Sequence, residues 1–404
     1  MYKSFKIESR KIKGLQITQT RQIKQLEDGF AVQSQNSKKF YFVDQEGLNC
    51  TCQDFEERTK TCKHAFAVQY YLQRITTAKK QVKIETKRLT YPQAWSAYNK
   101  SQETEKERFL ELLADLVKSV EEPEYKFGRP KTSQKDLLFA SALKVYTQFS
   151  LRRFQSDLKQ AKEKRLIDKT PCFASVGHFM QKKQLTPILQ NLISLSASVL
   201  KSVETKFAID SSGFRTTSFN EYCQEKHGKS KSHKWLKAHV VSGTKTNIIT
   251  SANISKQDGL GSGDSPHLKP LLKRTRETGF EIKEFSGDKA YSSRDNLELI
   301  DQHGGVPFIP FKSQATGKSK ANPIWKKMYH YFCLNQEEFN KHYHLRSNSE
   351  TVFHMIKTKF NDLLKSKSHT AQVNELLLKI LCHNIVVVIH ETNELGISAD
   401  FNDI

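Results

Sequence analysis

Three acidic residues stand at places in the sequence where their carboxylates could meet. Asp210 ends the apolar run KFAID, Asp288 follows the run EIKEF, and Glu350 lies near the start of a long helical pattern. The two runs predict strands of an open α/β sheet, where side chains at strand ends converge on a ligand. Because the chain has 43 acidic residues, this placement is what distinguishes the three.

Converged carboxylates repel one another unless cations relieve their charge. Magnesium or manganese suits hard oxygen ligands, and two such ions about 4 Å apart can activate an attacking oxygen and stabilise a leaving oxygen at phosphorus. The sequence therefore predicts a two-metal site for phosphodiester chemistry, with Asp210, Asp288 and Glu350 as its ligands.

Further polar residues share the predicted helix of Glu350. The set stands at offsets 0, 3, 7 and 14 and consists of Tyr343, Arg346, Glu350 and Lys357. At 100° per residue these positions fall within about 60° of arc, so one helix face would carry all four groups. A solvated helix face with an ordinary Arg–Glu pair would show the same pattern.

The spacing Y-x2-R-x3-E-x6-K resembles the signature of insertion-sequence DDE transposases of the YREK type. The segment ETKFAIDSSGFR is similar to the first-aspartate strand of that family, and FSGDKAYSSRDN is similar to its second-aspartate motif. The resemblance spans about residues 200 to 391. It implies an RNase H-like α/β fold in which the three acids bind a pair of metal ions.

The resemblance also implies roles for the residues around the acids. Arg346 and Lys357 would contact DNA phosphates, and Tyr343 would help to position the strand. Lys289 and Tyr291, which follow the second aspartate, are further candidate DNA contacts.

Two features bear on this assignment of the acids. The distance from Asp288 to Glu350 is 62 residues, which leaves little room for the large β insertion that some relatives carry there. Asp264, in the run GDSP, is the first alternative acid. The remaining rivals are Asp258, Asp295 and Asp301.

Four potential zinc ligands lie close together in the first part of the chain. Cys50-x-Cys52 is followed after nine residues by Cys62-x-His64, which supplies the four ligands of a closed tetrahedral zinc site. Buried apolar cysteines are the alternative. With aromatic strands before it and a helix after, the pattern resembles the SWIM zinc finger over about residues 28 to 72. The resemblance implies a structural zinc in a module that binds DNA or protein.

The order of predicted elements divides the chain into four regions. Residues 1–76 hold a β hairpin and the zinc-ligand pattern, and residues 77–125 predict a helical linker. Residues 126–200 predict short helices, and residues 201–404 alternate strands with helices as an α/β domain does. The expected fold class is an RNase H-like α/β catalytic domain preceded by a helical DNA-binding region and a small β-rich zinc-binding module.

The helical region holds a candidate DNA-binding surface. Two successive helices, the second rich in Arg and Lys, suit a helix-turn-helix that enters a DNA groove. A plain helical spacer with a solvated basic face explains the pattern equally well. The residues that would contact DNA are Arg152, Arg153 and Lys159.

The charge balance indicates a polyanionic partner. Lys and Arg outnumber Asp and Glu by 65 to 43, a net charge of +22 that would attract DNA before specific contacts form. A membrane surface would meet the same charge, but no basic amphipathic helix or lipidation signal is evident. The first residues lack the apolar core of a signal peptide, and no stretch reaches the roughly 18 apolar residues of a spanning helix.

Cysteine usage favours a reducing compartment. Seven cysteines, an odd number, do not suggest a disulfide framework. We therefore expect a cytoplasmic, nucleoid-associated protein of a prokaryote. Cys223 with His227, and Cys382 with His383, lack a second ligand pair, so both pairs predict ordinary surface or core residues.

Together these patterns predict a transposase that binds the ends of its element as a homodimer, hydrolyses a phosphodiester bond and transfers the freed 3′ end to target DNA. A related nuclease without strand transfer is one alternative. A non-catalytic DNA-binding protein descended from a transposase is the other. The presence of all three acids and their basic partners favours the first.

Overall fold

The computed structural model contains two compact units, residues 1–91 and 92–404. It describes residues 9–35, 37, 39–58, 61–79, 94–124, 127, 131–217, 235–256, 263–318, 322–399 and 401. Each unit buries its own set of apolar side chains. Three residues named from the sequence lie outside the described residues: Cys223, His227 and Asp258.

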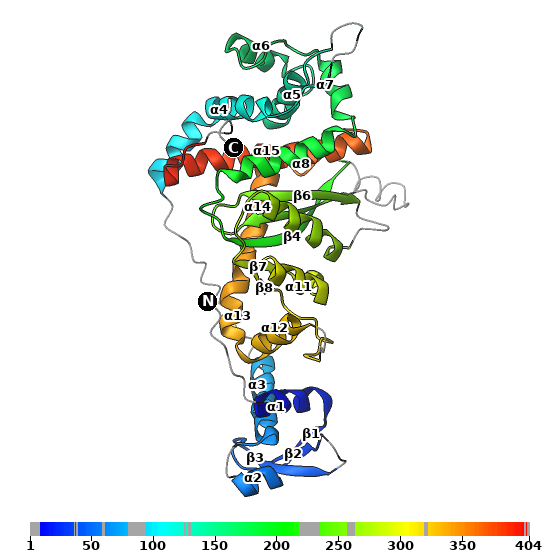
Figure 1. The fold of residues 1–404 in the computed structure, drawn as a ribbon, viewed down its shortest axis with the longest axis vertical. Coiled ribbons are helices and arrows are strands. Elements are labelled where there is room, and N and C mark those ends of the chain that lie inside the picture. Colours follow the sequence, from blue (N-terminus) through cyan, green and yellow to red (C-terminus); the bar gives the residue numbers. More distant parts are fainter. Residues whose placement is uncertain are drawn as a thin grey trace, which may run out of the picture. The chain divides into compact units, whose positions relative to one another are not determined.

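The first unit is a small antiparallel sheet with helices packed on one face (Figure 1). Its strands pair in the order β1 (Ile23–Gln25), β2 (Gly29–Gln33) and β3 (Phe40–Asp44). Its helices are α1 (Ser9–Thr20), α2 (Gln53–Arg58) and α3 (Lys63–Lys79). Phe30, Val32 and Val43 point into the core, as the alternation of a one-sided sheet requires. The hairpin expected from the sequence is therefore present, with β1 and α1 added to it.

The second unit is built around a five-stranded mixed sheet. Its strands are β4 (Lys206–Arg215), β5 (Trp235–Gly243), β6 (Ile249–Lys256), β7 (Glu284–Gly287) and β8 (Val306–Phe308), in the order β6-β5-β4-β7-β8. The first three in that order pair antiparallel, whereas β4, β7 and β8 pair parallel. The two strands expected before the aspartates are present as β4 and β7, but β4 continues to Arg215, so Asp210 lies within its strand and not at the end that the sequence predicted.

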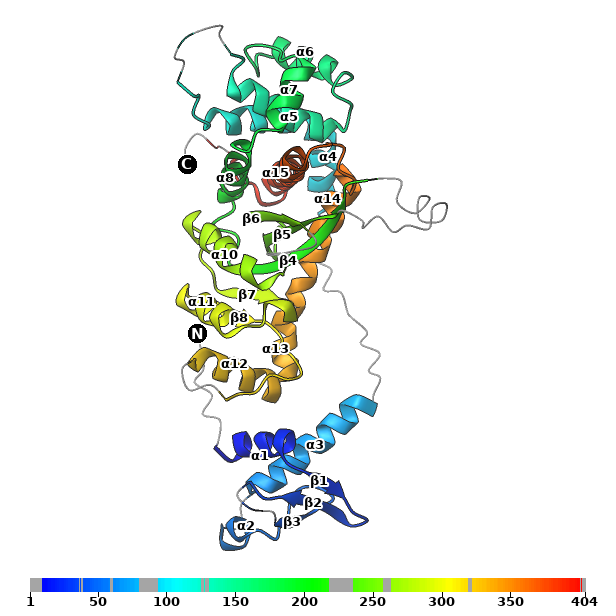
Figure 2. The ribbon, with the colours of Figure 1, turned by 90° about the vertical axis from the view of Figure 1, so that its right-hand side faces the viewer.

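Helices and short 3₁₀ turns connect and cover these strands. The helices are α10 (Leu268–Glu277), α11 (Arg294–Gln302), α12 (Pro323–Leu334), α13 (Gln336–Tyr343), α14 (Ser347–Phe360) and α15 (His369–Leu395). The 3₁₀ turns are η1 (Ser265–His267), η2 (Lys289–Tyr291) and η3 (His344–Arg346). α14 lies along β4, and α13 lies along β7 and β8 (Figure 2). Between Asp288 and Glu350, β8 is the one strand among the described residues, in keeping with the short spacing.

A layer of helices precedes the sheet in the chain and packs on α15. Its members are α4 (Trp95–Lys118), α5 (Gln134–Thr147), α6 (Gln155–Glu163), α7 (Phe173–Met180) and α8 (Leu185–Ser198). α8 and α15 lie between the other helices of this layer and the β6 edge of the sheet (Figures 1 and 2). Ser133 caps the start of α5, because its hydroxyl accepts hydrogen bonds from the backbone N–H groups of Lys135 and Asp136.

α4 differs from the helical linker expected over residues 77–125. Phe109, Leu113 and Leu116 are fully buried, and the helix packs along α15 and against α5. The apolar spacing of this segment indicated a helix but not the surface that its apolar face would cover. The helical region and the α/β region consequently form one unit instead of separate successive domains.

α15 is long and apolar enough to cross a membrane by length and composition alone, with a mean hydropathy of 1.5 over its most apolar window. This differs from the expectation that no segment reaches that length. Of that window, 89% is buried inside the fold. Packing against α4, α5 and α8 therefore accounts for the apolar sequence of α15 as a core helix.

Candidate active site and metal centres

Asp210 lies within β4, and Asp288 directly follows the neighbouring parallel strand β7. Ile209 of β4 pairs with Gly287 of β7, so the residues that follow these two are neighbours across the sheet. A Cβ at Gly287 would lie 2.8 Å from the Ile209 side chain, so glycine permits this close approach. Asp288 then begins η2, where its Oδ1 accepts a hydrogen bond from the Ala290 N–H at 2.9 Å.

Arg346 connects the first aspartate to Glu350. Its Nη1 lies 3.0 Å from Asp210 Oδ2, and its Nη2 lies 2.8 Å from Glu350 Oε1. The Ser349 hydroxyl also donates to Asp210 Oδ2, at 2.9 Å. The sequence placed Arg346 and Glu350 on one helix face, and the structure adds Asp210 as the second partner of the guanidinium.

The environments of these groups differ strongly. The Asp210 side chain is 15% exposed and the Arg346 side chain 19%, whereas the Glu350 side chain is 64% exposed. Burial raises the pKa of Asp210, and the nearby Asp288 adds to this effect, while the Ser211 N–H, Arg346 and Ser349 oppose it. A neighbouring cation therefore favours the ionised form of Asp210.

The other two residues of the predicted helix face are Lys357 and Tyr343. The Lys357 ammonium donates to Ser212 Oγ at 2.8 Å and stands 5.2 Å from the centre of the Phe214 ring. Burial lowers the pKa of Lys357. Tyr343 ends α13, and η3 separates it from α14, so the four residues do not share one continuous helix. Its ring centre nevertheless lies 6.0 Å from the Arg346 guanidinium.

An ion pair that the sequence did not reveal holds the far end of α14 to β4. Arg215 donates through Nε and Nη2 to the two carboxylate oxygens of Asp362, both at 2.7 Å. The Arg215 N–H donates to the Asp362 carbonyl, and the Leu364 N–H donates to the Arg215 carbonyl. Such a bidentate pair fixes both distance and orientation. The helix that carries Glu350 is thus tied to β4 at both ends.

Lys289 and Tyr291, which follow Asp288, differ in their exposure to solvent. Lys289 is exposed on η2 and is able to meet a ligand from solvent. Tyr291 is 1% exposed, so the DNA contact expected of it is wrong for this conformation. Burial raises the pKa of Tyr291, with Asp264 and then Asp210 adding to the effect. Tyr291 packs beneath the acids as part of the core.

Asp264, the first rival acid, is already engaged on the other face of β4. Its Oδ1 lies 2.6 Å from Lys237 Nζ, 2.9 Å from Ser211 Oγ and 3.4 Å from His239 Nδ1. Successive side chains of a strand point to opposite faces, so Ser211 points away from the side of Asp210. Burial opposes ionisation of Asp264, but hydrogen bonds from Lys237 and Ser211 outweigh it and lower the pKa.

Two further rival acids lie among the described residues. Asp295 and Asp301 are both exposed on α11.

All three acids and their basic partners fall in one segment that matches a known family. Residues 201–385 match the transposase DDE domain. One solved structure similar to the chain is the cryo-EM structure of the piggyBac transposase synaptic complex with hairpin DNA. The similarity covers 72% of this chain and 74% of that chain, with 10% sequence identity and a TM-score of 0.34. This match covers 185 of the 404 residues, and residues 201–385 are called the DDE domain after it.

The DDE domain has donor atoms that suit divalent cations. Carboxylate oxygens are the ligands that magnesium and manganese prefer, and the buried Asp210 beside Asp288 requires positive charge nearby. In the described part of the chain the three acids are not gathered into a single ligand set, and Arg346 bridges Asp210 and Glu350. The donors fit the metals chemically, with Arg346 as a competing cation.

Outside the DDE domain, four ligand atoms gather in the first unit. They belong to buried side chains and lie within 4.8 Å of one another: Cys50, Cys52, Cys62 and His64. His64 Nδ1 is 3.9 Å from Cys50 Sγ and 4.0 Å from Cys62 Sγ, near the roughly 3.5–3.8 Å edge of a zinc tetrahedron. Hydrogen bonds with Cys50 and His64 lower the pKa of Cys62, whereas the pKa values of Cys50, through its hydrogen bond with Cys62, and of Cys52, through burial, are raised. The fit to zinc therefore rests on the ligand types and their distances. The set fits one structural zinc ion.

The basic residues of the predicted helix-turn-helix are exposed, but its first helix is not. Arg152, Arg153 and Lys159 all face solvent, on the turn before α6 and on α6 itself. The Arg152 guanidinium lies 4.2 Å from the centre of the Phe173 ring. Residues 136–145 of α5 are all buried. The buried part of α5 therefore cannot contact DNA, whereas α6 and the turn before it present basic side chains to solvent.

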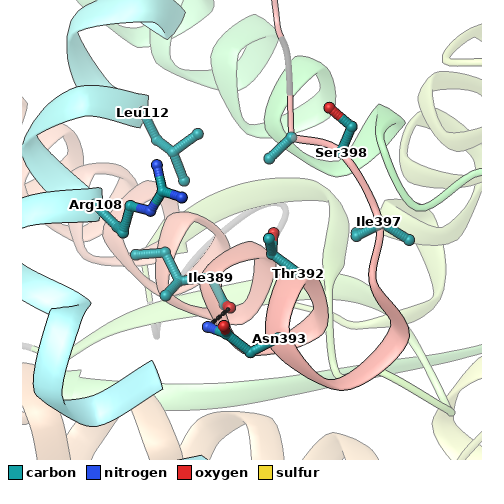
Figure 3. Close-up of a pocket in the computed structure, with 8 residues that line it drawn as sticks. Arg108, Leu112, Ile389, Thr392, Asn393, Ile397 and Ser398 are labelled. Atoms are coloured by element: carbon teal, nitrogen blue, oxygen red, sulfur yellow. Dashed lines mark hydrogen bonds between the residues drawn. The ribbon is translucent and has the colours of Figure 1, made fainter. Parts of the chain in front are cut away.

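A separate hollow of the second unit lies between α4, α15 and the chain after α15 (Figure 3). Its lining consists of Arg108, Leu112, Ile389, Thr392, Asn393, Ile397, Ser398 and Ala399. The Asn393 side-chain amide donates a hydrogen bond to the Ile389 carbonyl at 3.1 Å, so this N–H group is already paired. The lining includes none of the acids or their basic partners, so this hollow is not part of the candidate active site.

Proposed function

We propose that this protein is a DNA transposase of the YREK type, which cleaves at the ends of its element and transfers the 3′ end to target DNA. The match of residues 201–385 to the transposase DDE domain supports the general activity. One relationship supports the assignment of the acids: Arg346 joins Asp210 to Glu350, while Asp288 follows the strand paired beside Asp210. The three acids therefore come from three elements: Asp210 from β4, Asp288 from the turn after β7, and Glu350 from α14.

We propose an RNase H-like fold for the DDE domain. The support is the strand order β6-β5-β4-β7-β8, with three antiparallel strands continued by two parallel ones. The first acid then lies on the central strand β4 and the second directly after β7, where ligands gather in open α/β sheets. The third acid approaches on α14 from outside the sheet.

Two divalent cations held by Asp210, Asp288 and Glu350 would activate the attacking oxygen and stabilise the leaving oxygen during in-line displacement at phosphorus. Arg346 then has to leave at least one of its carboxylate partners, and its guanidinium is free to bind a DNA phosphate bidentately. Lys357, held beside β4 by Ser212, adds a second positive charge. Water is the nucleophile of the first displacement, and the freed 3′ hydroxyl is the nucleophile of the second.

We assign recognition of the element ends to residues outside the core of the DDE domain. The closed Cys₃His set supports a SWIM-like structural zinc module that binds DNA or protein. Arg152, Arg153 and Lys159 support a second DNA contact through α6, and Lys289 supports a contact beside the second aspartate. Tyr343 next to Arg346 would position the bound strand.

We also propose a homodimer on DNA, acting in the cytoplasm of a prokaryote at the nucleoid. Each chain offers one set of three acids, and an element has two ends, so two chains match the task. The net charge of +22 supports double-stranded DNA, both the element ends and the target, as the partner.

A cleavage assay on labelled duplex DNA that carries the element ends tests the acids. In magnesium we expect Asp210→Asn, Asp288→Asn and Glu350→Gln each to reduce cleavage by more than about a hundredfold, since each removes a metal ligand. Asp301→Asn, at an exposed acid of α11, is the matched control and should cleave like the wild type. Undiminished cleavage by the three variants would refute the assignment.

A second assay separates transposition from the two alternatives. Pre-cut ends and a target plasmid are supplied with magnesium or manganese, and joined products are measured. Joined products that depend on Asp210 support strand transfer. Cleavage without joining would indicate a nuclease, and DNA binding with neither reaction would indicate a non-catalytic descendant.

A further inference from the structure

The sheet of the first unit presents two phenylalanine rings on the side away from its core. Along β3, Tyr41 and Val43 pack into the core, whereas Phe40 and Phe42 alternate with them and are 42% and 39% exposed. A one-sided antiparallel sheet ordinarily carries polar side chains at such outward positions. An exposed pair of large apolar rings is therefore an informative departure from the usual burial pattern.

Both rings rest against neighbouring groups of the sheet. A Cβ at Gly29 would lie 2.8 Å from the Phe42 ring, so that ring lies over the backbone of β2. The Lys24 ammonium stands 5.4 Å from the centre of the Phe40 ring, within cation–π distance. The strand pairing aligns Lys24 with Ala31 and Ala31 with Phe42. Two exposed rings therefore share the outer face of the sheet, and a cation lies beside one of them.

The charge around this face favours a polyanion. Residues 1–91 contain 18 Lys and Arg against 9 Asp and Glu. Lys24 and Lys39 are both exposed. The acid that ends β3, Asp44, instead accepts hydrogen bonds from the Leu48 N–H and the Asn49 side chain, each at 2.7 Å. Lys24, the cation placed at the Phe40 ring, is exposed and can meet a phosphate, and the Asp44 carboxylate is already hydrogen-bonded.

We propose that this aromatic face, defined by Lys24, Ala31, Gln33, Phe40 and Phe42, binds single-stranded nucleic acid by stacking unpaired bases on its two rings. Every base has a flat π face, and aromatic rings beside cations bind single strands with little sequence preference. Phe40 and Phe42 are two residues apart on one strand, roughly 7 Å, so successive bases are able to meet both rings. A duplex hides its base faces within its own stack. The inference goes beyond strand transfer and does not depend on the acids of the DDE domain.

The test uses the full-length protein with zinc bound, and compares a fluorescent oligothymidylate with a labelled duplex by anisotropy. We expect Phe40→Ala combined with Phe42→Ala to weaken single-strand binding by at least about tenfold and to leave duplex binding nearly unchanged. Phe40→Tyr with Phe42→Tyr keeps the rings and should keep single-strand affinity. Lys24→Gln should lower the slope of log affinity against log salt by about one.

Phe127→Ala, at a ring of the second unit that is 89% exposed, is the matched control and should change neither affinity. Zinc content and the unfolding temperature establish that the variants are folded. If the double alanine variant loses zinc, Phe40→Ala alone leaves Phe42 over Gly29 and serves in its place. Wild-type single-strand affinity in a folded alanine variant would overturn the proposal. Equal losses for single strand and duplex would also overturn it, as would loss of self-association with oligonucleotide affinity unchanged.

Discussion

Arg346 Nη1 lies 3.0 Å from Asp210 Oδ2, and this contact joins the start of α14 to the central strand β4. The same guanidinium holds Glu350, whose side chain is 64% exposed, while Asp210 is largely buried. An exposed acid on a helix is thus linked to a buried acid on the sheet through one positive charge. Any divalent cation that binds these carboxylates competes with that charge.

Removal of Arg346 should therefore separate metal binding from DNA binding. We expect Arg346→Ala to bind manganese several-fold more tightly, because the competing cation is gone, and to lose DNA affinity and cleavage by about tenfold or more. Isothermal titration without DNA measures the first effect, and anisotropy with DNA measures the second. Arg108→Ala, at an arginine that is 61% exposed and paired with Glu111, controls for loss of one charge. Unchanged manganese affinity would show that Arg346 does not compete.

The pair Arg215–Asp362 should control how α14 sits on β4. We expect Arg215→Ala and Asp362→Ala each to lower the free energy of unfolding of the second unit, with a coupling energy of roughly 1 kcal/mol in a double-mutant cycle. The estimate is modest because both side chains are partly exposed, at 44% and 30%. Cleavage should fall further than stability, because the pair orients the helix of Glu350. The same cycle on Lys273 and Glu277, an exposed pair of α10, should give a coupling near zero.

The strands before the two aspartates could be predicted because the information is local: the runs KFAI and EF are short and apolar, as buried strands are. The sequence did not show that β4 continues past Asp210 to Arg215. That Ile209 pairs with Gly287 could not be predicted in the same way. Such pairing joins segments far apart in the chain and depends on how the whole sheet packs.

Helical spacing explains why only half of the contacts of Arg346 were foreseen. A helix fixes which residues three or four apart meet, so the Arg346–Glu350 pair follows from the sequence. The contact with Asp210 crosses between elements, as does the pair of Arg215 with Asp362. The burial of Tyr291 has the same origin, because the packing of η2 and not its sequence hides that ring.

Removal of zinc should unfold the first unit and leave the second intact. Four buried ligands lie within 4.8 Å of one another, and the three cysteine thiolates among them lose their counter-charge once the ion is chelated. We expect one zinc per chain, and two thermal transitions of which EDTA abolishes only one. Cys62→Ser should lose the zinc and the same transition, whereas Cys172→Ser, at an exposed cysteine, should retain both. A single transition unaffected by EDTA would rule out the structural zinc.

The second unit should lose stability in mild acid because of His383. This side chain is 2% exposed, and its Nε2 lies 3.0 Å from the Asn247 carbonyl. Burial lowers the pKa of His383 from 6.5 to about 4. Between these values the unfolded chain takes up a proton that the folded chain does not, so stability is complete above 6.5 and falls as the pH drops toward 4.

The size of this effect can be measured by denaturant unfolding at pH 7 and pH 5. From His383 alone we expect a loss of about 2 kcal/mol in the free energy of unfolding between these pH values. His383→Gln keeps a donor for the Asn247 carbonyl but cannot titrate, so its loss over the same interval should be smaller by that amount. His178→Gln, at an exposed histidine of α7, should retain the wild-type dependence. Equal losses for wild type and His383→Gln would contradict the assignment, because the acid sensitivity would then lie elsewhere. The buried His239 is one such place, since burial lowers its pKa to about 3.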